Sequence, residues 1–185
     1  DAAVDAAESV SSAENDQYRV MVPLANPAHE KELITLASAV AKQRGGVVDA
    51  VHVITVPDQT SLSYAADHVN RIEENHHSVL DAAERDAETF GVDVETHTII
   101  SHRGMGEVFD AAEDHEADLV VMGWGPDSSG RVEGAVEEMA GDLPCDFLVL
   151  KDRGFDPDRV LIPTAGGPDS ELSVEIGKLL QSEFG

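Results

Sequence analysis

The chain has 185 residues, with 37 Asp and Glu against 12 Lys and Arg, so its formal net charge is -25. This negative field repels nucleic acid and anionic membranes, because binding to them depends on Lys and Arg. Since 42% of the residues are hydrophobic and the carboxylates are spread along the whole chain, we expect a folded domain with an acidic surface and not a disordered acidic tail. The composition is typical of a halophilic cytosolic protein, and an ordinary acidic protein is the alternative.

Cysteine content and hydropathy exclude several further classes of protein. Cys145 is the one cysteine, so an intrachain disulfide and a cysteine-based metal cluster are excluded. Its neighbours Asp142 and Asp146 do not favour a thiolate, and we expect an inert thiol. No apolar run reaches the roughly 20 residues of a membrane helix, and no signal peptide is visible. The first residue is Asp and the sequence ends abruptly, which suggests a fragment of a longer protein.

The first half of the chain alternates strand and helix patterns. Residues 1–17 contain mostly Ala, Ser and acidic residues and predict a flexible acidic linker. A buried strand is predicted at 18–24, and Asn26 and Pro27 fit an N-cap and a first helical residue. An apolar stripe continues that helix as far as "RGG", whose glycines end it. The run "VVDAVHVITV" predicts the next strand.

The second half continues the alternation. A loop is followed by a long helical pattern that stops at Gly91, and three further strands and two further helices come after it. Continuous apolar strands that alternate with helices indicate an α/β fold with a parallel sheet covered on both faces. The predicted strands are "VDVETHTII", "ADLVVMG" and "DFLVLK", and the helices are "MGEVFDAAEDHE" and residues 132–140.

An internal repeat is the strongest organisational signal. "RVMVPLA" at 19–25 recurs as "RVLIPTA" at 159–165, and a turn-rich stretch and an amphipathic helix follow each copy. We therefore predict one domain at 18–152, with 153–185 as a linker and the truncated start, one strand and one helix, of a second copy.

Taken together, these motifs resemble the universal stress protein family. The residues that carry the resemblance are "VMVPLAN", "VHVITV", "ADLVVMGWG…GRVEGAV" and "LPCDFLVLK". The resemblance implies an open parallel five-stranded sheet of order 3-2-1-4-5, a Rossmann-like architecture. In such sheets ligands bind at the carboxyl ends of the strands at the switch point, here "VPLAN" and "VMGWG".

The family has an ATP-binding branch and a branch that does not bind ATP, and the loop after Gly123 decides between them. Members that bind ATP carry a Gly-x-x-Gly motif, a spacer of nine residues and then Gly-Ser or Gly-Thr. They also carry an Asp shortly after the Pro of the first strand. Here Pro126 replaces the second glycine, Ala135 replaces the hydroxyl, and Glu137 would bring a carboxylate near the phosphates. The resemblance therefore implies a degenerate nucleotide site at Pro23, Ala25, Val53, Met122, Gly123, Gly125, Gly134, Ala135 and Val136.

Three alternatives remain for this loop. It binds ATP as in the first branch, it is purely structural, or it takes a less charged ligand such as AMP or cyclic AMP. We expect no cofactor, with an adenine nucleotide as the candidate exception.

The remaining chemistry-bearing residues do not form a recognisable pattern. Among eight histidines, His76 and His77 are adjacent and point to different helix faces, and no His pair shares an obvious carboxylate at zinc-site spacing. We therefore expect no specific metal site. No nucleophile motif is present, so we expect no enzyme activity.

The expected function is that of a non-enzymatic regulatory or interaction domain. The spellings "PLANP", "MGW" and "LPCDFLVL" resemble the cytoplasmic universal stress protein region of cationic amino-acid permeases, which implies a soluble cytoplasmic part of a transporter. The alternative is a freestanding ATP- or AMP-binding switch. We also expect a homodimer or higher homo-oligomer, because the last strand is a sheet edge through which the family often dimerises. Its residues are Phe147, Leu148, Val149 and Leu150.

Overall fold

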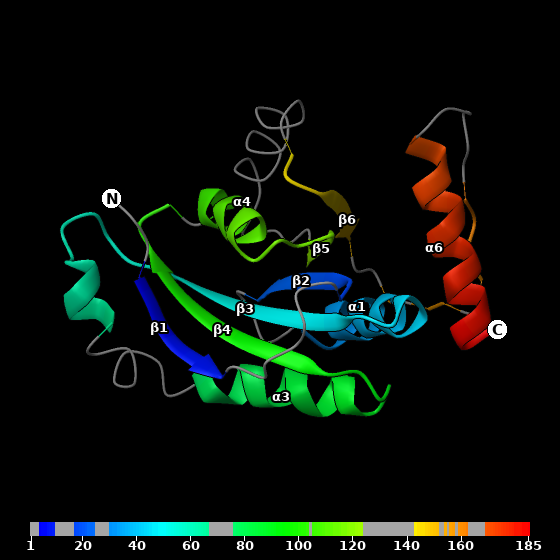
Figure 1. The fold of residues 1–185 in the computed structure, drawn as a ribbon, viewed down its shortest axis with the longest axis horizontal. Helices are drawn as coiled ribbons and strands as arrows, with labels where there is room; N and C mark the ends of the chain where they lie inside the picture. Colours follow the sequence, from blue (N-terminus) through cyan, green and yellow to red (C-terminus); the bar gives the residue numbers. More distant parts are fainter. Residues whose placement is uncertain are drawn as a thin grey trace.

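The computed structural model is an α/β fold built on one sheet (Figure 1). It describes residues 4–9, 17–24, 30–66, 76–103, 105–123, 143–151, 154, 156–157, 159–162 and 169–185. The strands are β1 (Val4–Ser9), β2 (Arg19–Leu24), β3 (Val47–Thr55), β4 (Val94–Ser101), β5 (Leu119–Gly123) and β6 (Asp146–Leu150). The helices are α1 (Glu30–Arg44), α3 (His76–Glu88), α4 (Met105–Asp114) and α6 (Asp169–Phe184).

The strand order is β1-β4-β3-β2-β5-β6. The β4-β3-β2-β5-β6 part is parallel throughout, so the predicted order 3-2-1-4-5 is confirmed. β6 lies at one edge of the described sheet. The switch point therefore falls between β2 and β5, whose described ladder pairs Val20 with Leu119 and Met21 with Val120.

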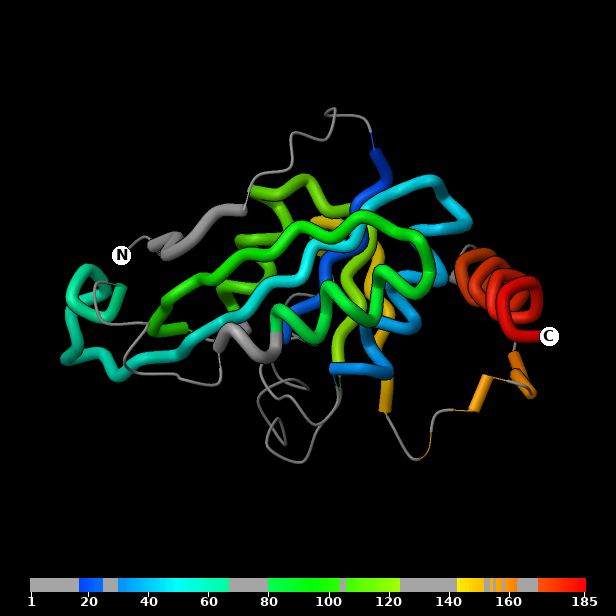
Figure 2. Tube along the Cα trace, turned by 90° about the horizontal axis from the view of Figure 1, so that it is seen from below, coloured from blue at the N-terminus to red at the C-terminus, as the bar shows by residue number. Residues whose placement is uncertain are grey.

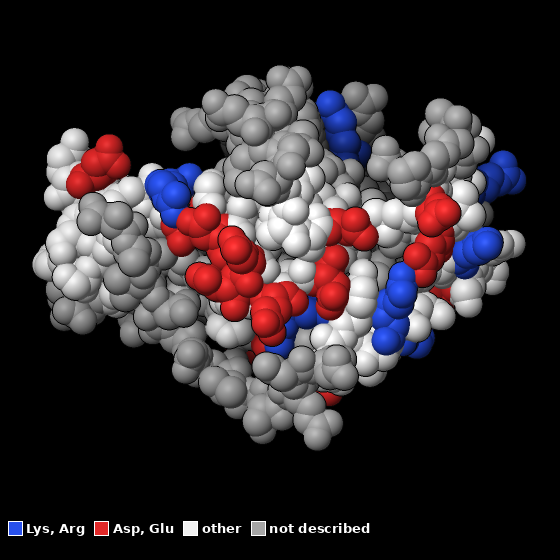
Figure 3. Space-filling view, turned by 45° about the horizontal axis from the view of Figure 1, so that its top comes forward, with Lys and Arg blue, Asp and Glu red and all other residues white. Residues whose placement is uncertain are grey.

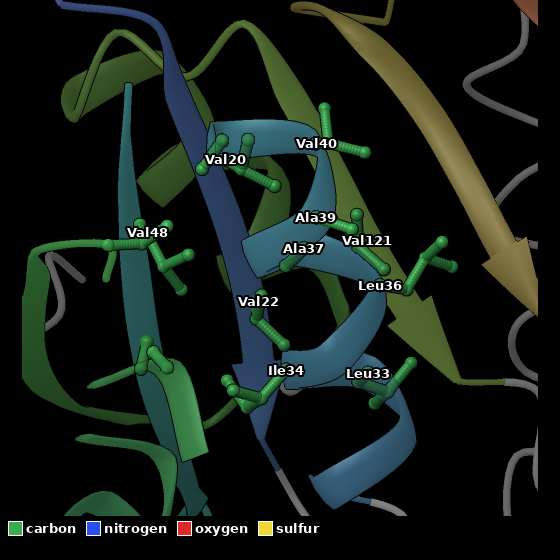
Figure 4. Packing of buried hydrophobic residues seen from close by; sticks show 14 of the residues in the cluster. Val20, Val22, Leu33, Ile34, Leu36, Ala37, Ala39, Val40, Val48 and Val121 are labelled. Atoms are coloured by element: carbon green, nitrogen blue, oxygen red, sulfur yellow. The ribbon is translucent and has the colours of Figure 1, made fainter. Parts of the chain in front are cut away.

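Helices cover both faces of the sheet, as the continuous apolar strands predict (Figures 1 and 2). One core lies between the sheet and α1, α3 and α6, and a second core lies between the sheet and α4. Figure 4 shows how α1 lies over β2, with apolar side chains filling the space between them. The residues labelled there are Val20, Val22, Leu33, Ile34, Leu36, Ala37, Ala39, Val40, Val48 and Val121.

Two predicted helix ends are confirmed at glycines. Gly45 follows α1 with φ 65° and Gly91 follows α3 with φ 69°. Both angles lie in the left-handed region, where glycine has no Cβ penalty. The glycine rule therefore placed both helix ends correctly, although residues 67–75, which include part of the predicted long helix, lie outside the described residues.

The N-terminal segment differs from the expected linker. Val4–Ser9 forms β1, which pairs antiparallel with β4 from Val4↔Ile100 to Ser9↔Thr96. The composition of this segment gave no strand signal because an added edge strand is held mainly by backbone hydrogen bonds, which any sequence without proline supplies.

The predicted second copy is formed only in part. Its helix is present as α6, but residues 159–162 are not in a strand. A strand needs a neighbouring ladder, and Ile162 instead lies against Gly177 of α6, while Leu161 is 92% exposed. Figures 1 and 2 show α6 beside α1 of the same chain, where Leu179 and Leu180 join the core. Ion pairs Lys42–Glu183 and Arg44–Glu175 connect the two helices.

Candidate functional site

The carboxyl edge of the sheet holds the predicted nucleotide site. β2 ends at Leu24 and β5 ends at Gly123, so the two strand ends flank the switch point where such folds bind ligands. Leu24 and Met122 are buried with exposed fractions of 1% and 3%. Leu33 of α1 lies beside Gly123. The strand ends themselves are therefore apolar, with Leu24, Met122 and Leu33 buried around them.

The remaining predicted nucleotide residues divide into two groups. Pro23 is half-buried on β2 and pairs with Val51, and Val53 packs against the core under α4. The other predicted positions lie outside the described residues, as do Trp124 and Glu137. They are Ala25, Gly125, Gly134, Ala135 and Val136.

Among the described residues, no contact of Gly123 demands a glycine. Its φ lies outside the left-handed region, and a Cβ built there would lie 3.6 Å from the Leu33 Cδ1 atom, an ordinary contact. A glycine without a Cβ lets other atoms approach the backbone closely. Gly123 is also the residue that matches the first glycine of the phosphate-binding Gly-x-x-Gly motif.

A buried carboxylate also lies near this edge. Glu30, at the start of α1, is 6% exposed, and its Oε1 atom has no hydrogen-bond partner among the described residues. Burial, helped by the nearby charge of Asp86, raises the pKa of Glu30 to about 7. Glu30 therefore changes charge near neutral pH, and its ionised form costs stability.

The amino edge of the same sheet carries a polar cluster that the sequence reasoning did not find. Asp49 of β3 is fully buried, with an exposed fraction of 0%. Its Oδ1 lies 2.8 Å from the Nδ1 of His97 on β4, and its Oδ2 lies 2.7 Å from the Nδ1 of His115, just after α4. Both imidazoles donate to one carboxylate, and their ring centroids are 4.6 Å apart.

Charged neighbours complete this cluster. The Arg19 guanidinium lies 3.8 Å from Asp49 Oδ2 and forms an ion pair with Glu95. Burial alone would raise the pKa of Asp49, but hydrogen bonds from His115 and His97 outweigh it and lower that pKa. The carboxylate is therefore held ionised inside the sheet, with nitrogen and oxygen donors gathered around it.

Sequence spacing hid the cluster because its members come from separate elements. Asp49 and His97 lie 48 positions apart, and Asp49 and His115 lie 66 positions apart. The usable signal was an Asp inside an otherwise apolar strand run, "VVDAVHV", because a buried carboxylate needs partners. The expectation that no His pair shares a carboxylate does not hold for His97 and His115.

Cys145 behaves as the sequence indicated. Burial raises the pKa of its thiol to about 11, and the charges of Asp146 and Asp118 raise it further. Asp146 was predicted from the sequence, whereas Asp118 is brought close only by the fold. The thiol is therefore protonated at neutral pH, which makes it a poor nucleophile.

Comparison with known proteins identifies the family. The model of the universal stress protein family matches residues 18–151. This match covers more than half of the chain, and the chain belongs to that family. A comparison with curated protein sequences gives no match.

Solved structures share the fold at low sequence identity. A universal stress protein from Archaeoglobus fulgidus, solved with dAMP, is 17% identical with a TM-score of 0.54, covering 72% of this chain and 98% of its own. A universal stress protein solved with cAMP is 16% identical with a TM-score of 0.52, covering 72% and 96%. An Arabidopsis thaliana family protein with AMP bound is 15% identical with a TM-score of 0.51, covering 74% and 93%.

Within the described part of the chain, none of the helices is long and apolar enough to span a bilayer.

Proposed function

We propose that the chain is a non-enzymatic regulatory domain that binds an adenosine monophosphate at the β2–β5 switch point. The observation that carries the proposal is Gly123, a glycine at the end of β5 that neither its φ nor its packing against the described residues requires. Backbone exposed in this way suits a phosphate that approaches closely. Relatives of the same fold were solved with dAMP, cAMP and AMP, which supports this ligand class.

A monophosphate fits the chain better than ATP. The net charge of -25 repels each additional phosphate charge. Ala135 and Glu137 stand where ATP-binding relatives carry hydroxyls, so hydrogen bonds worth about 0.5–1.5 kcal/mol each are missing. AMP and cyclic AMP bring fewer charges into the same place and depend less on those hydroxyls.

The proposal is tested by calorimetric titration of AMP, cyclic AMP, ADP and ATP in molar KCl, which screens the protein's own charge. We expect AMP or cyclic AMP to bind at micromolar to millimolar concentration, and ATP at least about tenfold more weakly, as the loss of one hydrogen bond implies. Equal or tighter ATP binding would contradict the assignment to a monophosphate. Absence of binding across the set would leave an interaction domain without a ligand.

We further propose that this domain is the cytoplasmic part of a cationic amino-acid permease from a halophilic organism. The spellings "PLANP", "MGW" and "LPCDFLVL" and the acidic excess support this. Reading the coding sequence on both sides of the chain tests it. Membrane spans before Asp1 are expected, and a start codon directly before Asp1 would count against it.

We also propose association into a homodimer through β6. This strand lies at the edge of the described sheet, and Val149 on it is 39% exposed. An unpaired strand edge is a template for pairing with a second copy. Light scattering in high salt is expected to give twice the chain mass of 19.7 kDa, and a monomer would contradict the proposal.

A further inference from the structure

The buried Asp49 carboxylate and the two imidazoles around it form a donor set at the amino edge of the sheet. One ligand atom each from Asp49, His97 and His115 lies within 4.8 Å of the others. Two imidazole nitrogens and one carboxylate oxygen are the ligands that bind Zn²⁺ when a fourth position is left to water. We propose that this cluster is a binding site for a divalent first-row transition metal, with Zn²⁺ the best fit.

The side chains must turn to accept an ion. The Nδ1 atom of His97 lies 2.8 Å from Asp49 Oδ1 and that of His115 lies 2.7 Å from Asp49 Oδ2, so the two rings face different oxygens of one carboxylate. Metal bonds of about 2.0–2.2 Å require both rings to turn toward one shared position beside the carboxylate. The three residues are anchored on β3, β4 and the end of α4. These rigid elements hold the donors at one point of the fold.

Proton balance permits the exchange. In the hydrogen-bonded state each ring carries its proton on Nδ1, and the metal needs that nitrogen's lone pair. A neutral ring can carry its proton on Nε2 instead. The side chains of His97 and His115 are 15% and 17% exposed, so water reaches part of each ring and can exchange its proton.

Charge balance also favours a cation. Asp49 and Glu95 carry two negative charges and Arg19 carries one positive charge, so these three side chains leave one net negative charge beside the two imidazoles. The Arg19 guanidinium lies 3.8 Å from Asp49 Oδ2, and its positive charge would repel a metal ion bound there. The ion pair of Arg19 with Glu95 offsets part of that repulsion. The surrounding acidic surface adds attraction over a longer range.

That acidic surface also sets the conditions of the test. Figure 3 shows acidic side chains running in a band across the face it displays, with smaller groups of Lys and Arg beside them. Such carboxylates bind divalent ions diffusely, which would mask a specific site. The titration therefore uses molar KCl with Mg²⁺ in excess, because Mg²⁺ prefers oxygen ligands and does not compete well for imidazole.

The experiment is a calorimetric titration of the chelator-treated full chain with Zn²⁺, repeated on His97→Gln, His115→Gln and the control His102→Gln. His102 lies one residue beyond β4 and contacts the Val56 carbonyl oxygen at 3.1 Å, outside the cluster. We expect one equivalent to bind, and each cluster variant to weaken affinity by at least about 10–100-fold, since even outer-shell partners of a metal cost that much. His102→Gln should bind as the unaltered chain does.

Co²⁺ gives an independent readout that needs no calorimetry. Bound by two nitrogens, one carboxylate and water, it should show the intense visible bands of four-coordinate cobalt, and these should vanish in His97→Gln and His115→Gln. Circular dichroism of the variants verifies that they fold. Absence of stoichiometric Zn²⁺ binding, or equal weakening by all three variants, would overturn the site and leave the cluster as a hydrogen-bond network.

Discussion

The two edges of one parallel sheet differ in what they offer a ligand. The carboxyl edge has apolar strand ends at Leu24 and Gly123, with the buried carboxylate of Glu30 nearby. The amino edge at Asp49, His97 and His115 presents buried side-chain donors. The fold rule for open α/β sheets points to the first edge whatever side chains are present, whereas the second edge is found only by looking at the chemistry of specific residues. A family fold therefore predicts where one ligand binds and is silent on additional sites.

The largest expected effect is at the amino edge. Asp49→Ala removes the carboxylate that both imidazoles contact and that forms an ion pair with Arg19. We expect the free energy of unfolding to fall by about 2–3 kcal/mol, because two hydrogen bonds to a charged, buried group are lost. Urea denaturation at constant KCl measures it.

The matched control for Asp49→Ala is Asp81→Ala, an exposed aspartate on α3, for which a change within about 0.5 kcal/mol is expected. Equal losses in the two variants would mean that the Asp49 contacts contribute nothing to stability.

The next effect lies at the carboxyl edge and has the opposite sign. The pKa of Glu30 is raised by burial from 4.5 to about 7, so the folded state resists ionisation more than the unfolded state does. The destabilisation is absent below pH 4.5, grows between pH 4.5 and 7, and is complete above pH 7. Glu30→Gln should therefore raise the free energy of unfolding by about 1–2 kcal/mol at pH 8 and change little at pH 4.

The pH dependence separates this effect from a general charge effect. Glu84→Gln removes one charge from an exposed position on α3 and should show no such step between pH 4 and 8. A gain at pH 8 that persists unchanged at pH 4 would exclude Glu30 ionisation as its cause.

The smallest effect on stability is expected for Gly123→Ala, and this variant tests most directly whether the carboxyl edge binds a ligand. Gly123→Ala adds a Cβ that meets Leu33 at an ordinary contact distance, so the free energy of unfolding should change by less than about 0.5 kcal/mol. In the proposed binding mode the phosphate lies against the Gly123 backbone, and an added methyl group makes that approach less close, so AMP affinity should fall by about tenfold, as the loss of one hydrogen bond implies.

Gly106→Ala is the control for Gly123→Ala. Its Cβ would also be in ordinary contact, 3.7 Å from the Arg103 Cβ, but it lies in α4. Thermal unfolding and AMP titration of both variants decide whether Gly123 serves a ligand. An unchanged AMP affinity in Gly123→Ala would remove the observation on which the nucleotide proposal depends.

Local sequence signals predicted most of the sheet and its helices. Apolar runs such as "VVDAVHVITV" and the glycines at Gly45 and Gly91 report local conformation, and the structure confirms the strand and both helix ends. β1 was missed because pairing at an edge depends on the backbone and not on side-chain pattern. The repeat at 159–165 predicts a strand, and its described part, residues 159–162, is not in one, since a strand requires a neighbour that the local sequence does not supply.

The sites divide in the same way. Gly123 follows a strand directly and was found by its local context. The cluster of Asp49, His97 and His115 depends on β3 lying beside β4 and on the end of α4 reaching both. In the sequence, only Asp49 within an apolar strand pointed to the cluster. That signal identifies the aspartate but not the histidines that contact it.

The most direct test of two separate sites is nuclear magnetic resonance of the ¹⁵N-labelled chain in high salt, titrated first with AMP and then with Zn²⁺. We expect AMP to shift the amide signals of Leu24 and Gly123 and to leave those of Asp49, His97 and His115 in place. We expect Zn²⁺ to shift the signals of Asp49, His97 and His115 and to leave those of Leu24 and Gly123 in place. AMP-induced shifts confined to the amino edge, or one set of residues responding to both ligands, would contradict this expectation.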